Sequence, residues 1–515
     1  MQEFKCQLSP EQAADEQFIL KTIRRNARID AETPIYFRWH KRSIDARKPQ
    51  ILINCTFHYS LEPIEYEDFG FDFQQVEGKK EIHIIGAGPA GLFAALRALE
   101  LGFKPIIFER GKDVRSRRRD LAMLNKEGVV NPESNYCFGE GGAGTYSDGK
   151  LYTRSKKRGD VEKVLRLLVH FGADRNILVD AHPHVGTNKL PQIITAIRDC
   201  IRTLGGEVHF EQKLTDLTLE NKQIKRICIN DSNWISVENL ILATGHSARD
   251  IFHLLHRKGI TIQAKPFALG VRVEHTQELI DKIQYHGRMH DDVLPPASYS
   301  LVTQVQDRGV YSFCMCPGGI IAPCATDTEE VVTNGWSPSK RNNPYSNSGI
   351  VVSIYPEDFK DPTNPLVCLE FQQEIERRCW EAAGKNQQVP AQRLLDFVEK
   401  KKSLDFPRSS YQPGIVSVEM DTLFPPFVVK RLRQGFIDFG KKMRGFLTND
   451  AVVHAPESRT SSPVQIPRDA SNLQHIDINN LYPCAEGAGY AGGIVSAAID
   501  GMKCVDAIQE KEHEK

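Results

Sequence analysis

A glycine pattern early in the chain has the spacing of a diphosphate-binding turn. Residues 86–91 read Gly-Ala-Gly-Pro-Ala-Gly, which fits the pattern G-x-G-x-x-G. In such a turn the first glycine permits a tight bend, the second admits a pyrophosphate, and the third lets the next helix pack closely. The helix start offers unpaired N–H groups and a positive dipole end, and a proline is tolerated there because it has no N–H. We therefore predict that Gly86, Gly88, Pro89, Ala90 and Gly91 bind a dinucleotide.

An acidic residue follows at the distance that a ribose contact requires. Glu109 ends the next apolar run, about 20 residues beyond the turn. A carboxylate there accepts hydrogen bonds from ribose hydroxyls, which favours a free 2′-hydroxyl over a 2′-phosphate. Arg110 stands next to it and weakens that preference. Both residues are candidate cofactor-binding residues, and the pattern leaves open which dinucleotide is bound.

A second glycine-rich stretch spans residues 138–150, which read Phe-Gly-Glu-Gly-Gly-Ala-Gly-Thr-Tyr-Ser-Asp-Gly-Lys. Such density of glycine lets backbone come within contact distance of a flat ring or a phosphate. Thr145, Ser147 and Asp148 could hydrogen-bond the polar edge of a ligand. The alternative is a flexible surface loop. The candidate cofactor-binding residues here are Gly141, Gly142, Ala143, Gly144 and Thr145.

Two later segments combine a short strand with glycine. Ala243, Thr244 and Gly245 end a buried apolar run, and open α/β sheets bind ligands at the carboxyl ends of their strands. Residues 481–500 read as a strand, then Glu486 and a glycine run, then a helix that begins near residue 493 and could aim its N-terminus at a ring edge or a phosphate. The alternative is an ordinary helix start. The candidates in this last segment are Glu486, Gly487, Gly492, Gly493 and Ile494.

Several side chains could add chemistry of their own. Cys314 and Cys316 could form a dithiol relay, but a disulfide at this spacing is strained, and two structural strand cysteines are the alternative that we favour. His182, His184 and His246 could act as acid or base, although a lone histidine is more often structural. The sequence names no catalytic residue. Because Cys-x-Cys without a partner pair does not make a zinc site, we expect no metal.

Basic residues gather at three places. The helix 110–119 could help to bind cofactor phosphates, especially through Arg115 or Arg117, although a solvated helix face is the more common explanation. Arg459 could contact an anion. Residues 41–48 could touch nucleic acid, yet an exposed basic turn is more common.

The elements that position these residues suggest an α/β fold with additions. Strand, turn, helix and strand follow each other over 82–109, and another helix is predicted over 190–204. The chain begins with a helix over 9–25 and β-rich runs near 35–39 and 51–59, followed by an acidic linker over 62–72. We predict an N-terminal α+β module at 1–78, the first part of a Rossmann-like domain at 79–264, an inserted α+β substrate or cap domain at 265–473, and a return to the Rossmann-like domain at 474–515.

Composition narrows the class of protein. The chain has 515 residues, and its 66 basic residues balance 66 acidic ones, which argues against a dominant nucleic-acid footprint. The sequence shows no stretch of about 18–20 apolar residues and no basic-then-apolar leader pattern, so we expect neither a membrane span nor export, but a cytoplasmic location with reduced thiols. The assembly state is not predicted.

Together these segments resemble the flavoproteins with two dinucleotide-binding domains. The glycine turn with Glu109, the Ala-Thr-Gly of 243–245 and the closing run from Glu486 carry that resemblance. More narrowly, the chain resembles the FAD-dependent or NAD-utilising dehydrogenases, through residues 42–47, 139–150, 182–191, 313–319 and 457–464. One position departs from the flavoprotein pattern, because Ala485 stands where a glycine often precedes the acid.

The resemblance implies FAD binding and redox activity. Glu109 would hold the adenosine ribose, Glu486 would lie near the pyrophosphate and ribityl chain, and residues 492–494 would offer N–H groups to the flavin. We predict a flavoenzyme that passes hydride between a small-molecule substrate and flavin N5. The middle segment, residues 265–473, lacks any comparable nucleotide fingerprint, so any NAD(P)H that reduces the flavin would dock transiently in the substrate cavity. The alternatives are a non-enzymatic binder with a dinucleotide fold, or a flavin-dependent RNA modifier.

Overall fold

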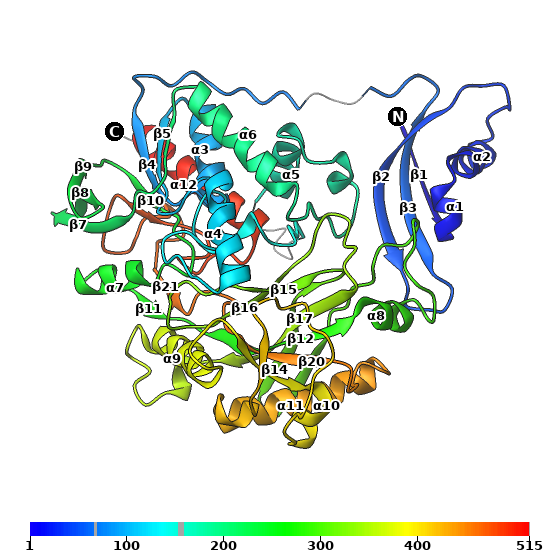
Figure 1. Cartoon of the computed structure of the whole chain (residues 1–515). Helices are drawn as coiled ribbons and strands as arrows, with labels where there is room; N and C mark the ends of the chain where they lie inside the picture. Colours follow the sequence, from blue (N-terminus) through cyan, green and yellow to red (C-terminus); the bar gives the residue numbers. More distant parts are fainter. Residues whose placement is uncertain (66–68, 153–158, 514–515) are drawn as a thin grey trace.

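The computed structural model describes residues 1–65, 69–152 and 159–513, so part of the predicted linker, residues 66–68, lies outside the described residues. The N-terminal module lies at one side of the molecule (Figure 1). Its antiparallel sheet has the order β1-β3-β2, formed by Gln2–Leu8, Leu52–Ser60 and Tyr36–Asp45. The helices α1 (Pro10–Ala14) and α2 (Glu16–Ala27) pack beside it.

This module corrects three sequence expectations. The single helix predicted over 9–25 is two helices, because the carboxylate of Asp15 ends the first and accepts the N–H groups of Gln17 and Phe18 at the start of the second. Strand β1 was not predicted. The expected basic turn is for the most part strand, since β2 continues to Asp45.

The parallel sheet that carries the glycine turn has the order β22-β10-β4-β5-β6. Its strands are Leu481–Pro483, Leu240–Leu242, Glu81–Ile85, Lys104–Phe108 and Glu207–His209. β22, from the far end of the sequence, pairs in parallel with β10, and β10 pairs in parallel with β4. The carboxyl ends of these three strands therefore meet at one edge of the sheet.

Helices pack around this sheet (Figure 1). α3 (Pro89–Glu100) crosses from β4 to β5, and α12 (Ile494–His513) packs against α3. The predicted helices at 190–204 and near 493 are confirmed as α6 (Leu190–Thr203) and α12. Also here are α4 (Val114–Glu127), α5 (Val161–His170), α7 (Arg249–Arg257) and a small sheet of β7 (Leu214–Glu220), β8 (Gln223–Ile229) and β9 (Asn233–Ser236).

A large mixed sheet forms the other half of the molecule, in the order β13-β14-β17-β12-β20-β18-β19. Its strands are Val302–Val305, Arg308–Cys316, Tyr345–Ile354, Phe267–Thr276, Val452–Glu457, Val389–Arg393 and Ile415–Ser417. Its helices are α8 (Gln277–Gln284), α9 (Val367–Ala382), α10 (Leu394–Glu399) and α11 (Pro426–Lys442). Two short ribbons adjoin it, β11 (Gln263–Ala264) with β21 (Val464–Gln465) and β15 (Ile320–Pro323) with β16 (Thr333–Trp336).

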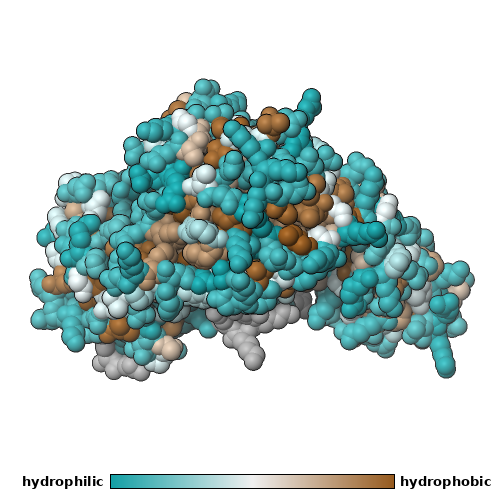
Figure 2. Space-filling model, turned by 90° about the horizontal axis from the view of Figure 1, so that it is seen from below, coloured by the Kyte–Doolittle hydropathy of each residue, from teal (hydrophilic) through white to brown (hydrophobic). Residues whose placement is uncertain are grey.

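Hydrophobic side chains fill the space between these layers. The parallel sheet and its helices enclose one apolar core, and the large mixed sheet encloses another. Seen from below, the surface is mostly hydrophilic with hydrophobic patches between polar side chains (Figure 2). Within the described ranges, no helix combines the length and the apolar character that crossing a bilayer requires.

Candidate functional site

The predicted diphosphate turn has the backbone geometry that its glycines suggest. Gly86 follows β4 with φ +104°, and a β-carbon there would lie 2.4 Å from the carbonyl oxygen of Ala243 at the end of β10. A β-carbon at Gly91 would lie 1.9 Å from the carbonyl oxygen of Gly86. Helix α3 starts at Pro89 with Gly88 as its N-cap, and no side chain caps it. The start of α3 therefore keeps the N–H groups and dipole that attract an anion.

Glu109 joins this turn to the glycine-rich segment. Its carboxylate is buried and accepts three backbone N–H groups, from Ala87 (2.9 Å), Gly111 (2.8 Å) and Gly139 (2.9 Å). One oxygen takes two of these bonds and the other takes one, so the second oxygen retains acceptor capacity. The contact with a ribose stays a prediction.

The glycine-rich segment lies directly against the turn and against the start of α12. The N–H of Gly141 donates to the carbonyl of Ala87 (2.7 Å), and a β-carbon at Gly142 would lie 3.1 Å from the Cα of Gly88. A β-carbon at Gly144 would lie 3.2 Å from the side chain of Ile494. Glycine is needed here for close approach of backbone to backbone, which a flexible surface loop does not require.

The two remaining segments also meet. A β-carbon at Gly487 would lie 2.8 Å from the carbonyl oxygen of Gly245. Ala485 has φ +59°, a left-handed conformation that favours glycine, which explains why the flavoprotein pattern often has glycine there. The N–H of Gly492 donates to the hydroxyl of Ser496 (3.2 Å), and the N–H of Gly493 donates to the carboxylate of Glu486. A ligand that takes the N–H groups predicted to face the flavin would therefore replace these internal partners.

Sequence segments far apart thus converge on the edge where β4, β10 and β22 end. The turn contacts residues 243 and 142, residue 245 contacts 487, and residue 144 contacts 494. All of the predicted glycine-bearing segments take part. The resulting cradle is built mainly of backbone, which suits a long, polar, flat cofactor.

Two of the candidate arginines and one threonine have roles other than those predicted. Arg117 is fully buried, not on a solvated face, and its guanidinium donates to the carbonyl oxygens of Asn135, Tyr136, Glu140 and Gly142 at 2.7–2.9 Å. It therefore holds the glycine-rich segment in place and is not directed at a phosphate. Arg110 pairs with Glu133 and Asp250. The Thr145 hydroxyl is buried and donates to the carbonyl of Glu140 (2.8 Å).

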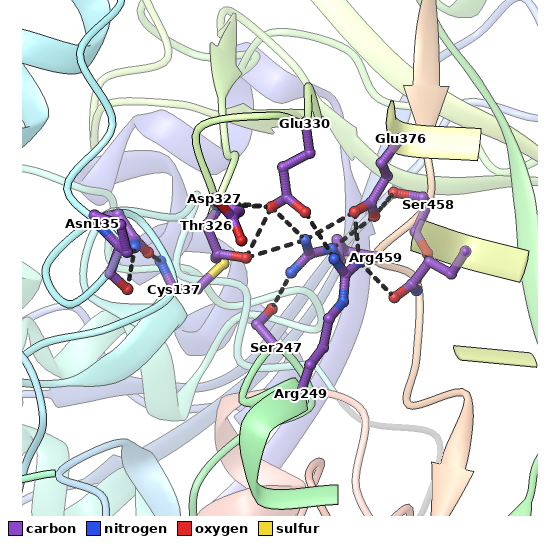
Figure 3. Close-up of polar contacts among 12 residues, drawn as sticks. Asn135, Cys137, Ser247, Arg249, Thr326, Asp327, Glu330, Glu376, Ser458 and Arg459 are labelled. Carbon is purple, nitrogen blue, oxygen red and sulfur yellow. Dashed lines mark hydrogen bonds and ion pairs between the residues drawn. The ribbon is translucent and has the colours of Figure 1, made fainter. Parts of the chain in front are cut away.

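A buried ion-pair network joins the parallel-sheet half to the mixed-sheet half (Figure 3). Arg249, at the start of α7, and Arg459, after β20, both pair with Glu330 and Glu376. The Arg459 guanidinium also donates a hydrogen bond to the hydroxyl oxygen of Ser247 (2.8 Å). Although burial raises the pKa of Glu330, the two guanidinium groups outweigh it and lower this pKa to about 2. Arg459, expected to contact an anion, is thus occupied by carboxylates of the chain itself, which sequence reasoning missed.

The three candidate histidines have different surroundings. His246 Nε2 lies 3.9 Å from the carboxylate of Glu486, and its Nδ1 is buried without a hydrogen-bond partner among the described residues. Burial, with Arg459 and Arg249, lowers the pKa of His246 to about 3, so its ring is neutral at pH 7. Burial raises the pKa of Glu486. His184 Nε2 lies 3.1 Å from the carbonyl of Ser339, and His182 packs against Tyr152.

Among the residues that the structure describes, two groups of side chains have the composition of metal ligands. Cys484, Asp500 and Cys504 lie together in the core, but Arg468 and the N–H of Ala485 occupy the Asp500 carboxylate. The other group is Glu3, His40 and His58 on the N-terminal sheet, where Lys5 pairs with Glu3 at 2.7 Å. In both groups a cation of the chain already neutralises the carboxylate that a metal would need.

Comparisons with known proteins agree with parts of this description. Residues 266–460 match a family model described as "FAD-dependent protein, C-terminal domain-like", and residues 1–60 match a domain of unknown function. Solved structures that resemble the chain include CtdE in complex with FAD (TM-score 0.34, 9% identity, 84% of this chain and 89% of that chain) and the halogenase PltM (0.38, 10%, 85% and 71%). Glycine oxidase from Bacillus cereus has a TM-score of 0.31 at 12% identity, over 84% of this chain and 96% of that chain. Likeness at this level carries no argument about activity.

One relative is much more similar to this chain in sequence than these solved structures are. A Clostridium beijerinckii protein named "Uncharacterized protein" is 41% identical over 493 residues, which cover 92% of each chain. An alignment of this extent reaches well beyond any single domain of the chain. The chain therefore belongs to one family with this clostridial protein.

Proposed function

We propose that this chain is an FAD-dependent oxidoreductase. The observation that carries the proposal is the cradle at the carboxyl ends of β4, β10 and β22, where backbone atoms of the glycine-bearing segments approach one another too closely for β-carbons. Open α/β sheets bind dinucleotides at such an edge. The match of residues 266–460 to FAD-dependent proteins supports FAD as the dinucleotide.

The residues present fit this cofactor. The uncapped start of α3 would hold the diphosphate, and Glu109 would use its remaining acceptor capacity for the adenosine ribose. Glu486 and the start of α12 would lie along the ribityl chain and the ring. When bound, FAD supplies two-electron chemistry, and the protein supplies position and local charge.

The chain's own residues would tune this site through protonation. His246 is neutral at pH 7 and carries a buried Nδ1 without a partner among the described residues, so it can exchange a hydrogen bond with a ligand. Burial raises the pKa of Glu486, whose carboxylate lies 3.9 Å from His246 Nε2. Both side chains are largely shielded from solvent, with 14% of the His246 side chain and 30% of the Glu486 side chain exposed, which strengthens the hydrogen bonds that they make.

The first test is whether the purified protein binds FAD. We expect a yellow protein with flavin absorbance near 450 nm, release of FAD on denaturation, and rebinding of FAD in preference to FMN or NAD. A colourless protein with no affinity for FAD contradicts the proposal and favours a non-enzymatic binder. RNA binding with a steep salt dependence would instead favour an RNA modifier.

A pair of glycine variants tests the cradle itself. Gly86→Ala and Gly259→Ala both place alanine at positive φ, at +104° and +68°, which costs about 1 kcal/mol. Only Gly86→Ala also directs a β-carbon at backbone, 2.4 Å from the carbonyl of Ala243, whereas Gly259 has open space within 4 Å. We expect Gly86→Ala to lose FAD and Gly259→Ala to keep it. Equal FAD content in the two variants would show that the turn is not the binding site.

The proposed reaction is hydride transfer between a small-molecule substrate and flavin N5. Anaerobic titration of the FAD-loaded protein with NADH, NADPH and other candidate reductants, followed at 450 nm, tests it. Loss of the flavin absorbance with one class of reductant identifies the hydride donor. If none of the reductants lowers this absorbance, the dehydrogenase activity loses its support.

A further inference from the structure

A lysine and two cysteines lie close together beside the proposed FAD cradle, at Lys150. Its ammonium nitrogen lies 3.9 Å from the sulfur of Cys314 and 3.7 Å from the sulfur of Cys316. Lys150 ends the glycine-rich segment and pairs with His184 as an isolated β-bridge. The segments 139–150, 182–191 and 313–319, widely separated in the sequence, therefore meet at this one cation.

The backbone at the cysteines is irregular in a way that brings the two sulfurs to the same cation. Cys314 has φ +46° near the end of β14, a left-handed conformation that non-glycine residues rarely adopt. The pairing of β14 with β17 shifts register between Phe313 and Cys316. The carbonyl of Cys314 accepts from Arg272 (3.4 Å) and from the Cys316 thiol (3.3 Å). Strained backbone of this kind is found most often where a site needs it.

The charges around the sulfurs favour a thiolate. Lys150 pairs with Asp148 (3.0 Å), but Asp148 also pairs with Arg341 (2.7 Å), so one carboxylate serves two cations. Arg272 is matched by Glu457 (2.6 Å). Across the described residues of this cluster, one positive charge is thus left for the thiols to balance.

The two thiols differ from each other in acidity. The neighbouring Cys316 thiol, Lys150 and Arg272 outweigh burial and hold the pKa of Cys314 well below its usual value. The neighbouring Cys314 and burial raise the pKa of Cys316. The charge on Cys314 in turn raises the pKa of Glu486, so the thiolate lies within electrostatic reach of the cradle. Together the pair resembles an attacking thiolate with a protonated partner thiol.

We propose that Cys314 and Cys316 are a redox-active pair, with Cys314 as the thiolate held by Lys150, and that the pair exchanges two electrons with FAD in the adjacent cradle. This inference rests on the proposed function. Oxidation forms one S–S bond, breaks the S–H bond of Cys316, and releases two electrons and one proton. FAD accepts the two electrons together with this proton, which balances the step. The substrate class that this assigns is a dithiol or a disulfide.

The thiolate can be tested without FAD, by absorbance at 240 nm as a function of pH. A thiol of ordinary pKa is only about 3% ionised at pH 7, so a thiolate at Cys314 gives roughly 30-fold more signal per site. We expect this signal in the wild type and its loss in Cys314→Ser. The control is Cys200→Ser, which replaces a half-buried cysteine on α6 and should keep the signal. Lys150→Met should lose most of it and Lys150→Arg should keep it. Equal signals at pH 7 in the wild type and Cys314→Ser would overturn the assignment.

The electron exchange is tested in the FAD-loaded protein. After anaerobic treatment with dithiothreitol and its removal, thiols are counted by differential alkylation of the unfolded protein and mass spectrometry, with flavin absorbance followed in parallel. We expect a disulfide between Cys314 and Cys316 to form as one equivalent of flavin is bleached, with no change at Cys200. Bleaching without this disulfide, or no disulfide under any glutathione buffer, would overturn the redox pair. A protein that shows the thiolate but binds no FAD would instead contradict only the proposed function.

Discussion

The close packing of α12 against α3 makes Gly501→Ala a sensitive test of how the C-terminal segment is joined to the phosphate turn. Gly501 lies inside α12, and a β-carbon there would lie 2.1 Å from the carbonyl oxygen of Ala90, at the start of α3. Alanine is favoured over glycine in a helix interior by about 1 kcal/mol. Overpacking a well-packed core costs about 1–3 kcal/mol. Because the obstacle is backbone and not a side chain that can rotate, we take the upper end, which leaves a net loss of about 2 kcal/mol.

Hydrogen exchange of backbone amides measures this loss locally. A drop of about 2 kcal/mol in the free energy of opening makes exchange roughly 30-fold faster. We expect this acceleration in peptides from α3 and α12, and none in the large mixed sheet. Lys503→Ala, an exposed substitution in the same helix, serves as the control and should stay within about 0.5 kcal/mol of the wild type. Unchanged or slower exchange in Gly501→Ala would refute the reasoning, because helix propensity would then outweigh the close contact.

Two further predictions concern buried charges. Arg117→Met removes a donor from four backbone carbonyls and leaves those of Asn135 and Tyr136 unpaired, so we expect hydrogen exchange over residues 135–145 to show a loss of about 3–5 kcal/mol in the free energy of opening. The exposed Arg115→Met should have no measurable effect, and equal behaviour of the two variants would show that Arg117 does not hold the segment. Glu330 has a pKa lowered to about 2, so its stabilisation is complete above its usual pKa of 4.5 and is lost as the pH falls towards 2, by about 3 kcal/mol in all. The free energy of unfolding, followed by circular dichroism, should fall less steeply with decreasing pH over this range in Glu330→Gln than in the wild type or in the exposed control Glu329→Gln. Identical slopes in the three proteins would contradict the ion-pair network.

The elements that the sequence predicted well are those with strong local signals. Strand, turn, helix and strand over 82–109 are confirmed as β4, α3 and β5, because apolar runs are separated there by glycine and proline. The helices at Leu190 and Ile494 also begin where they were expected. The prediction of one continuous helix over 9–25 was wrong. An aspartate such as Asp15 can lie inside a helix or cap the start of one, and the sequence alone does not show which of these occurs.

Side-chain roles were predicted less well, for a different physical reason. Arg117 reads as one of several basic residues on a helix, and nothing near it in the sequence shows that its partners are carbonyls some twenty residues away. Arg459 finds its carboxylates on α9 and in the loop before β16. The sequence predicts structural strand cysteines at Cys314 and Cys316. In the structure a register shift lies between Phe313 and Cys316, and both sulfurs lie within 4 Å of the Lys150 nitrogen.

The sequence by itself thus determined which backbone could come close to a ligand, because glycine spacing and apolar periodicity are local properties that the chain carries before it folds. Only the tertiary structure decided which charged side chains are paired with one another inside the protein and which can act on a ligand or a reactive group. Ion pairs join residues that are distant in the chain, and their strength depends on burial, which exists only once the two halves have packed together. The role of Gly86 could be predicted from the sequence, whereas only the fold places the ammonium group of Lys150 beside Cys314 and Cys316.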